Sequence, residues 1–252
     1  MKNIIFSPGT FHLGNKVSRN ILVSTDQGIM IVNRFDFDTN GLAGHSKWLM
    51  DHGNSDTVEI NYCVQSIRHV VDPVIFDVGA NIGTFSIWFS KIFQSGRIYS
   101  FEPQKQIFYQ LCGNISLNNL YNIDAYNIGL GSKNDYITIK EPDYFSNHDY
   151  GVFSLIEEKI TTTQRDVTVE IITLDNFVKI NHIKKLDLLK IDAEGMDLDV
   201  LKGATQSIEN FFPVIFIEHC DNRTSNLENL KNFLKQYDYY FDVLGNNLLC
   251  QK

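Results

Sequence analysis

From Val74 onward, short apolar runs alternate with segments of helical hydrophobic periodicity. The runs VIFDV, RIYSFE, LDLLKID and PVIFIEH each precede a segment whose apolar residues recur every three or four positions. Continuous apolar strands are typical of a parallel sheet that is covered on both faces. Their alternation with helices favours right-handed crossover connections. The pattern therefore predicts an α/β fold with a doubly wound, mostly parallel sheet.

Two regions do not follow this alternation. In residues 1–70, two β-type runs surround Asp26-Gln27-Gly28 and indicate a hairpin, and the remainder is polar with weak periodicity. A connection at about 141–166 is longer than a compact domain needs. Its aromatic residues favour an ordered lid; they are Tyr144, Phe145, Tyr150 and Phe153. We therefore expect a small N-terminal β extension over 1–70, packed on a core at 71–252 that carries a lid-like insertion.

Composition and charge argue against a protein that binds nucleic acid through its phosphates. The formal net charge is -8, and the chain contains no long basic block. The four cysteines are scattered without a C-x-x-C pair, which is typical of free thiols in a reducing compartment. The N-terminal stretch falls short of a secretory signal, and the apolar run FFPVIFI is too short to span a bilayer. We therefore expect a cytoplasmic protein with no membrane span.

The turn after the first core strand, DVGANIGT, is a candidate binding site. In an open parallel sheet, ligands bind beyond the carboxyl ends of the strands, and glycines there let the backbone approach a ligand. The dinucleotide fingerprint G-x-G-x-x-G requires a glycine where Asn81 stands, and the turn lacks the Gly-Lys-Ser/Thr of a P-loop. A pyrophosphate site is therefore disfavoured. A tight turn with Asp77 as a helix cap is the structural alternative.

A carboxylate after the next strand agrees with a binding site. Glu102 ends the run RIYSFE, about 20 residues after Gly79, where a carboxylate can accept hydrogen bonds from both hydroxyls of a ribose. Pro103 suits the first turn of the following helix, because its missing N–H costs nothing there. Taken alone, Glu102 is equally consistent with a solvated acid at the start of a helix.

Longer motifs carry a family resemblance. The order D-x-G-x-N-x-G in residues 77–83 resembles the cofactor loop of class I S-adenosylmethionine (SAM) methyltransferases. FEPQKQIFYQLCGNISLNN, TLDNF and KIDAEGMDLDVLKGA together resemble the FkbM family of these enzymes, over about residues 56–220. Ala193 and Asp197 depart from the Val and Glu that are common in the family. The resemblance implies a seven-stranded, Rossmann-like sheet and SAM-dependent O-methylation of a hydroxyl on a sugar, a glycan or a natural-product small molecule.

The resemblance also implies a set of cofactor-binding residues. They comprise the glycine loop, the ribose carboxylate and its proline, a turn against the adenine, a strand-end acid, and an acid just upstream of the core. These residues are Asp77, Gly79, Ala80, Asn81, Gly83, Thr84, Phe85, Glu102, Pro103, Asn127, Gly129, Leu130, Asp192 and Glu59.

Polar residues at two strand ends are the catalytic candidates. A sugar hydroxyl becomes a good nucleophile only as its proton leaves, so a base or a cation should stand nearby. Asp192 and Glu194 follow the fourth core strand, and in extended geometry residues two apart face the same side. Glu218 and His219 end the fifth strand, which we expect to lie alongside. These groups can activate a hydroxyl or position a substrate, and three of them, Asp192, Glu194 and Glu218, can hold Mg²⁺.

Several alternatives remain open at this stage. Asp192 and Glu194 can instead cap a helix that begins near Gly195, and Glu218 with His219 can form a structural hydrogen-bonded pair. His148 can act as a base carried by the insertion, although a lone loop histidine is more often solvated. A catalytically silent SAM-binding domain and a nicotinamide-dependent oxidoreductase are the competing functions. The residues name neither the acceptor nor the oligomeric state.

Overall fold

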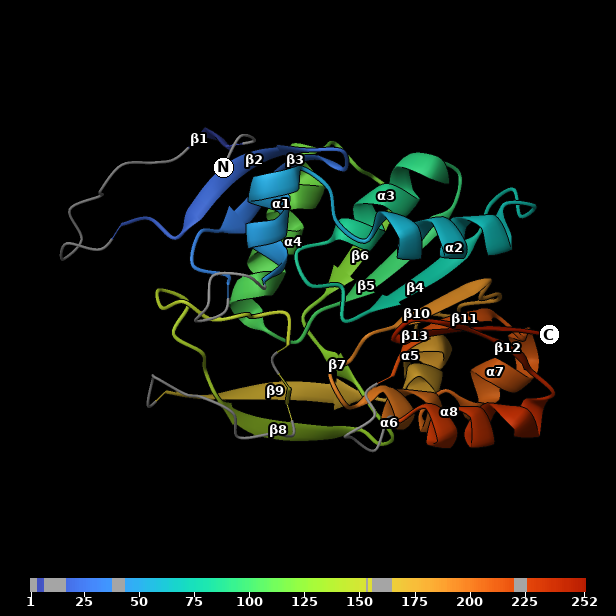
Figure 1. Cartoon of the computed structure of the whole chain (residues 1–252). Coiled ribbons are helices and arrows are strands. Elements are labelled where there is room, and N and C mark those ends of the chain that lie inside the picture. The colour runs from blue at the N-terminus through green and yellow to red at the C-terminus, as the bar shows by residue number, and fades with distance from the viewer. Residues whose placement is uncertain (1–3, 7–16, 38–43, 153, 156–164, 220–225) are drawn as a thin grey trace.

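A seven-stranded sheet lies at the centre of the computed structural model, which describes residues 4–6, 17–37, 44–152, 154–155, 165–219 and 226–252 (Figure 1). Its strand order is β12-β13-β11-β10-β4-β5-β6. In chain order the strands are β4 (Val74–Val78), β5 (Arg97–Phe101), β6 (Ile123–Tyr126), β10 (Leu188–Ile191), β11 (Val214–Glu218), β12 (Tyr240–Leu244) and β13 (Asn247–Gln251). Within this sheet, β13 runs opposite to both of its neighbours, and the other strands are parallel. The predicted mostly parallel, doubly wound sheet is confirmed.

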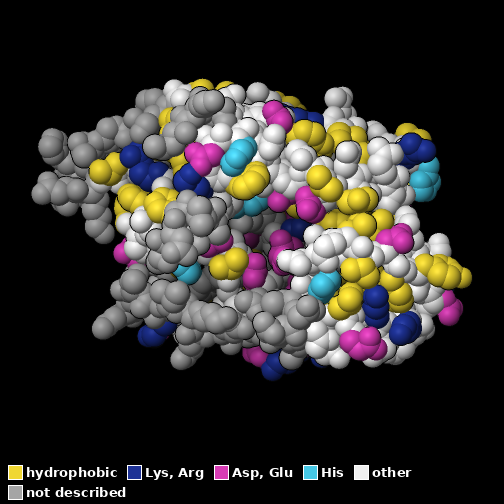
Figure 2. All heavy atoms as spheres, viewed as in Figure 1, with side chains coloured by type: hydrophobic (Ala, Val, Ile, Leu, Met, Phe, Trp, Pro, Cys, Tyr) yellow, Lys and Arg dark blue, Asp and Glu magenta, His cyan; other side chains and the backbone are white. Residues whose placement is uncertain are grey.

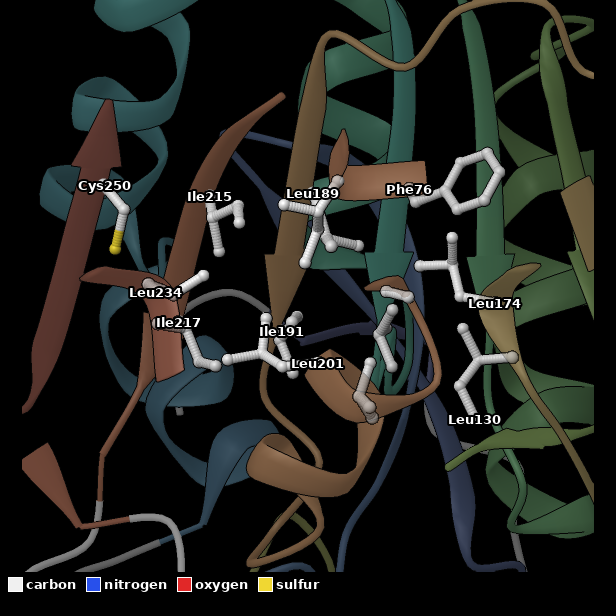
Figure 3. Packing of buried hydrophobic residues seen from close by; sticks show 14 of the residues in the cluster. Phe76, Leu130, Leu174, Leu189, Ile191, Leu201, Ile215, Ile217, Leu234 and Cys250 are labelled. Carbon is white, nitrogen blue, oxygen red and sulfur yellow. The ribbon is translucent and has the colours of Figure 1, made fainter. Parts of the chain in front are cut away.

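Helices cover both faces of the sheet. One face carries α2 (Thr57–Ile67) and α3 (Thr84–Ile92); the other carries α5 (Leu174–Ile180), α6 (Asp197–Lys202), α7 (Thr205–Phe211) and α8 (Leu227–Leu234), which is followed by the 3-10 helix η1 (Lys235–Tyr237). Alternate strand residues serve the two layers: Leu188 packs with α2 and α3, and Leu189 packs with the opposite layer. Figure 3 shows this second layer, where side chains of neighbouring strands converge on Leu174, Leu201 and Leu234.

A second, three-stranded sheet extends from the edge of the core. Its order is β7-β9-β8, with β7 at Gly129–Leu130, β8 at Asp135–Lys140 and β9 at Asp166–Ile172. Gly129 and Leu130 pair with Ile171 and Ile172. The turn that we expected against the adenine, which contains Asn127, Gly129 and Leu130, is therefore wrong for its last two residues, because they form a strand with a partner some 40 residues later in the chain.

The N-terminal strands form a third sheet that rests on helix α4 (Lys105–Leu117). Its strands are β1 (Ile4–Phe6), β2 (Asn20–Thr25) and β3 (Gly28–Asn33), and the predicted hairpin is the β2–β3 pair. Asn114 of α4 accepts from the Ile31 N–H (2.5 Å) and donates to its carbonyl (3.1 Å). Asn118, one turn later, makes the same two bonds with Ile29 (3.3 and 2.8 Å). These amides satisfy the outer edge of β3, as a further strand would.

Two helices, α1 (His45–His52) and α2, lie in the stretch after the hairpin, for which the weak periodicity predicted no element. The buried residues of α2 are Ile60, Cys63, Val64 and Ile67. Their spacing is that of one helical face, so the sequence did contain the signal. They pack against Phe85 and Phe89 of α3, so α2 belongs to the layer that covers the central sheet.

The long helical pattern after β10 is divided between α6 and α7. Gly203 separates them, and its carbonyl accepts from the Asp175 N–H at 2.9 Å. A β-carbon at Gly203 would lie 2.0 Å from the Gly131 carbonyl oxygen, so the chain passes here at backbone distance. In the described part of the chain, no helix combines the length and the apolar character that a membrane crossing requires.

Candidate functional site

The turn between β4 and α3 is shaped by residues in left-handed backbone conformations. Gly79 has φ 71° and Asn81 has φ 50°. A β-carbon at Gly79 would lie 1.8 Å from the Asp192 carbonyl oxygen, so the turn packs directly against the end of β10. Asparagine adopts the left-handed region more readily than most residues, which explains how Asn81 stands where the dinucleotide fingerprint has glycine.

Glu102, at the end of β5, holds this turn from the other side. Its Oε2 accepts from the Asn81 N–H at 3.0 Å, and its Oε1 accepts from the Gln104 N–H at 2.7 Å. The side chain is buried, and burial raises the pKa of Glu102 to about 7 although both backbone bonds lower it. Each carboxylate oxygen has two lone pairs, so each oxygen retains one for a further donor.

A hollow of about 590 Å³, including its open mouth, lies above the turn, and we name it the loop pocket. It is lined by Val78, Gly79, Asn81, Phe101, Glu102, Pro103, Gln104, Ile128, Gly129, Leu130, Gly151, Leu155, Asp192, Ala193, Glu194 and Met196. The structure thus gathers seven of the predicted cofactor-binding residues in one wall: Gly79, Asn81, Glu102, Pro103, Gly129, Leu130 and Asp192.

Other predicted cofactor residues lie beside the loop pocket. Asp77, Ala80, Gly83 and Thr84 are not part of its wall as far as the described residues show. Asp77 is fully buried behind the turn and accepts from the Ser86 hydroxyl at 2.5 Å. The Thr84 hydroxyl donates to Asp56 at 3.0 Å. The Asn127 side chain donates to the carbonyls of Glu102 (2.8 Å) and Pro103 (3.0 Å), so it secures the segment after β5.

Lys190, to which the sequence analysis gave no role, is a central contact of the site. Its ammonium is buried 3.2 Å from Asp77 Oδ1 and 3.7 Å from Asp192 Oδ2, and it donates to the Gly79 carbonyl at 3.0 Å. Burial lowers the pKa of Lys190, but the charges of Asp77 and Asp192 outweigh it and leave the pKa above its usual value. The sequence did contain a signal for this contact: a lysine inside an apolar strand indicates a buried ion pair, because buried lysines are normally paired.

A second hollow adjoins the first at Asp192, and we name it the acid-lined pocket. It measures about 920 Å³, including space open to solvent, and is lined by Asp56, Glu59, Phe85, Lys190, Ile191, Asp192, Phe216, Glu218, Leu244, Gly245, Asn246 and Asn247. Figure 2 shows acidic side chains gathered in a hollow near the middle of this face of the molecule. Glu59 and Phe85, predicted to bind the cofactor, therefore lie in the wall of this neighbouring pocket.

Three predicted carboxylates meet where the two pockets join. Asp192, Glu194 and Glu218 each offer an oxygen atom within 4.8 Å of the others. The expected extended geometry is wrong, because Glu194 (φ 48°) and Gly195 (φ 99°) turn the chain. Burial and the neighbouring carboxylates raise the pKa of Glu218 well above its usual value, and it shares a hydrogen bond with Asp192. A protonated Glu218 can therefore donate this hydrogen bond to the Asp192 carboxylate.

The first residue of helix α6 is itself an acid, which binds the turn before the helix. The helix begins at Asp197, and the Asp197 carboxylate accepts from the N–H groups of Ala193 (2.7 Å) and Gly195 (3.1 Å). Asp192 and Glu194 both line the loop pocket. The Nε2 atom of His219 lies 3.1 Å from the Gly245 carbonyl oxygen. His219 lines neither pocket in the part of the chain that the structure describes.

Comparison with known proteins decides the family. A family model described as a methyltransferase FkbM domain matches residues 77–241, which is more than half of the chain. The chain belongs to the FkbM methyltransferase family. The resemblance read from the KIDAEG block and the glycine loop is thereby confirmed.

Individual relatives of this FkbM-family chain are distant. Methyltransferase 1 of Beauveria bassiana (strain ARSEF 2860) is 24% identical over 177 residues, covering 65% of this chain and 71% of that protein. Hexuronic acid methyltransferase AglP of Haloferax volcanii is 28% identical over 148 residues, covering 59% of this chain and 56% of that protein. The crystal structure of methyltransferase FkbM from Methylobacillus flagellatus KT matches with a TM-score of 0.51 at 16% identity, over 85% of this chain and 56% of that chain. The structural match supports the class I methyltransferase fold.

Proposed function

We propose that this FkbM-family methyltransferase transfers a methyl group from SAM to a hydroxyl group of a sugar, a glycan or a natural-product small molecule. One observation carries the proposal: the loop pocket, in which Glu102 can bind the hydroxyls of a ribose, joins the acid-lined pocket at Asp192. The two pockets offer one place for a donor and one for an acceptor, with a carboxylate between them.

The residues of the loop pocket suit SAM. Glu102 keeps one lone pair on each oxygen for the two ribose hydroxyls. Ile128 and Leu130 offer apolar surface to an adenine, and Gly79 leaves the backbone accessible. When bound, SAM supplies an activated methyl group on its sulfonium. Because Asn81 interrupts the dinucleotide fingerprint, a nicotinamide-dependent oxidoreductase is the weaker alternative.

Asp192 is the residue that we assign as the base. It lies in the walls of both pockets, so it can accept the proton of an acceptor hydroxyl as the methyl group is transferred. Glu218 and Glu194 lie beside Asp192 where the two pockets join, and they orient Asp192 or the acceptor. Holding both reactants in line is itself a large contribution to methyl transfer, of several kcal/mol.

Mg²⁺ is a second way to use the same junction. Three carboxylates within reach of one point provide the hard oxygen ligands that Mg²⁺ prefers. Asp192, Glu194 and Glu218 would then hold the ion, which would lower the pKa of the acceptor hydroxyl.

The acceptor class rests on chemistry and on relatives. The printed name of AglP specifies a hexuronic acid, which supports a sugar acceptor here. The carboxylates of the acid-lined pocket repel phosphates, so we do not propose a nucleic acid acceptor.

The test is methyl transfer from labelled SAM to a panel of hydroxylated sugars, uronic acids and polyketide alcohols. We expect Asp192→Asn to lower turnover by about 100-fold or more, with less than about a threefold change in SAM affinity, because a positioned base contributes at least that much. Asp199→Asn removes an acid that pairs with Lys202 on the exposed side of α6, and it is the matched control.

Two outcomes would change this assignment. Equal losses of turnover and SAM affinity in Asp192→Asn would give Asp192 a cofactor-binding or structural role. If EDTA abolishes the activity and Mg²⁺ restores it, the reaction uses a metal ion. If EDTA has no effect, the metal-assisted mechanism is excluded. SAM binding without transfer to any acceptor would favour a silent binding domain.

A further inference from the structure

The insertion after β8 contributes to the wall of the loop pocket. Gly151 and Leu155 both line it. A β-carbon at Gly151 would lie 3.4 Å from the side-chain nitrogen of Asn81, so the insertion lies next to the glycine turn. Gln104, another wall residue, donates from Nε2 to the Tyr150 carbonyl at 3.1 Å. The position of the insertion therefore determines the shape of the pocket on this side.

Asp36, far away in the sequence, fastens the insertion to the N-terminal region. Its Oδ1 accepts from the Tyr150 N–H at 3.0 Å, and its Oδ2 accepts from the Ser46 N–H at the start of α1 at 2.8 Å. The Asp36 side chain is buried, with 3% of its surface exposed. Hydrogen bonds from backbone N–H groups to a carboxylate are stronger than those to neutral acceptors. Asp36 thus joins three segments through two charge-assisted bonds.

Other contacts surround this joint. The Asn33 side chain donates to the Tyr144 carbonyl at 3.0 Å, and the His148 N–H donates to the Phe35 carbonyl at 3.1 Å. The Arg19 guanidinium lies over the rings of Tyr144 and Phe145, 5.4 and 5.5 Å from their centroids. The insertion is therefore packed on the N-terminal region along its described length up to Tyr150. Asp36 is the contact nearest to the pocket, because it binds the residue before Gly151.

We propose that Asp36 is a positioning residue of the cofactor site, which holds the insertion against the glycine turn so that the loop pocket is preformed. The inference rests on the proposed function, in which SAM occupies the loop pocket. It assigns a role in cofactor binding to a segment that lies outside the family match at 77–241.

The expected loss of cofactor affinity depends on the fraction of molecules that keep the insertion in place. Without the Asp36 carboxylate, the N–H groups of Tyr150 and Ser46 lose their acceptor. The conformation in which the insertion lies against the glycine turn then becomes less stable. Apparent affinity falls by the fraction of molecules that keep the competent conformation. We expect Asp36→Ala to weaken cofactor binding about tenfold.

The experiment is calorimetric titration of the full chain with S-adenosylhomocysteine and with 5′-methylthioadenosine, which lacks the amino-acid tail. Asp36→Ala should weaken both about tenfold. Asp36→Asn should weaken both by a smaller factor, because its one carbonyl oxygen can replace only one of the two acceptors. Asp26→Asn removes the same charge from the β2–β3 turn, whose exposed Asp26 carboxylate accepts from Asn54, and should leave both affinities unchanged. Hydrogen exchange at the Tyr150 amide should accelerate in the Asp36 variants at temperatures well below unfolding.

The outcomes separate this inference from the proposed function. Failure of the wild-type chain to bind either ligand would overturn the proposed function and with it this inference. Binding by the wild type with equal affinities in the folded Asp36 variants would overturn the inference alone. Where Asp36→Ala does not fold, Asp36→Asn decides: an affinity equal to that of the wild type contradicts the role of Asp36.

Discussion

The buried ion pair of Lys190 and Asp77 shows how single residues shape this site. The Lys190 ammonium contacts the Asp77 carboxylate on one side and the Gly79 carbonyl on the other, so it ties strand β10 to the glycine turn. Desolvation of the two charges offsets much of their attraction, and a buried pair adds little net stability. Removing one partner is different, because the other charge then stays buried without compensation.

Lys190→Met should therefore lower the free energy of unfolding by about 3–5 kcal/mol. The double variant Lys190→Met/Asp77→Asn should recover most of this loss, because the buried Asp77 charge is removed as well and Asp192, the other partner of Lys190, is partly exposed to solvent. Lys202→Met is the control: Lys202 forms an exposed pair with Asp199, and its loss should cost less than about 1 kcal/mol. Urea unfolding measures all three. A double variant no more stable than Lys190→Met would refute the explanation.

Among the elements, the boundary between α6 and α7 depends on a close backbone approach. The Gly203 carbonyl is used by Asp175, and no side chain fits between Gly203 and the Gly131 carbonyl. Because both groups at this contact belong to the backbone, neither can rotate away. The contact joins the segment after β7, and with it one wall of the loop pocket, to helix α6.

Gly203→Ala should lower the free energy of unfolding by about 1–3 kcal/mol, because overpacking forces the backbone to shift. Gly113→Ala in α4 is a matched control. Among the described residues, the new methyl group there meets the flexible end of Ile31, and alanine favours the helix, so the change should stay within about 1 kcal/mol of wild type. Equal destabilisation by both changes would argue against a specific contact at Gly203.

The sequence indicated those elements whose signal is local. Strands such as VIFDV and LDLLKID stand out because both sheet faces are buried, and the rule of strand ends located Gly79, Glu102 and Asp192. Strand β7 could not be found, because two residues become a strand only through a distant partner. Asp36 could not be related to the pocket for the same reason: its contact with Tyr150 exists only in the folded chain. The face of α2 was readable but was obscured by polar surroundings.

Over the whole molecule, three separate regions enclose one pocket. The central sheet supplies the glycine turn, Glu102 and Asp192; the small sheet supplies Gly129 and Leu130; the insertion supplies Gly151 and Leu155. Asp36, in the segment after β3, is not among the described residues that line the pocket, but it holds the insertion. This arrangement places the proposed donor between rigid strand ends and a fastened insertion, and the proposed acceptor on the far side of Asp192.

Calorimetric titration of the protein with SAM and, separately, with NADH tests the central claim most directly. We predict that SAM binds with a Kd between about 1 μM and 1 mM and that NADH does not. Burial raises the pKa of Glu102 to about 7, so this carboxylate ionises as the pH rises through that value. Only the ionised form accepts from both ribose hydroxyls, so SAM should bind about tenfold more tightly at pH 8 than at pH 6. In Glu102→Gln, binding should be weaker and independent of pH over this range. Tight binding of NADH without binding of SAM would contradict the account.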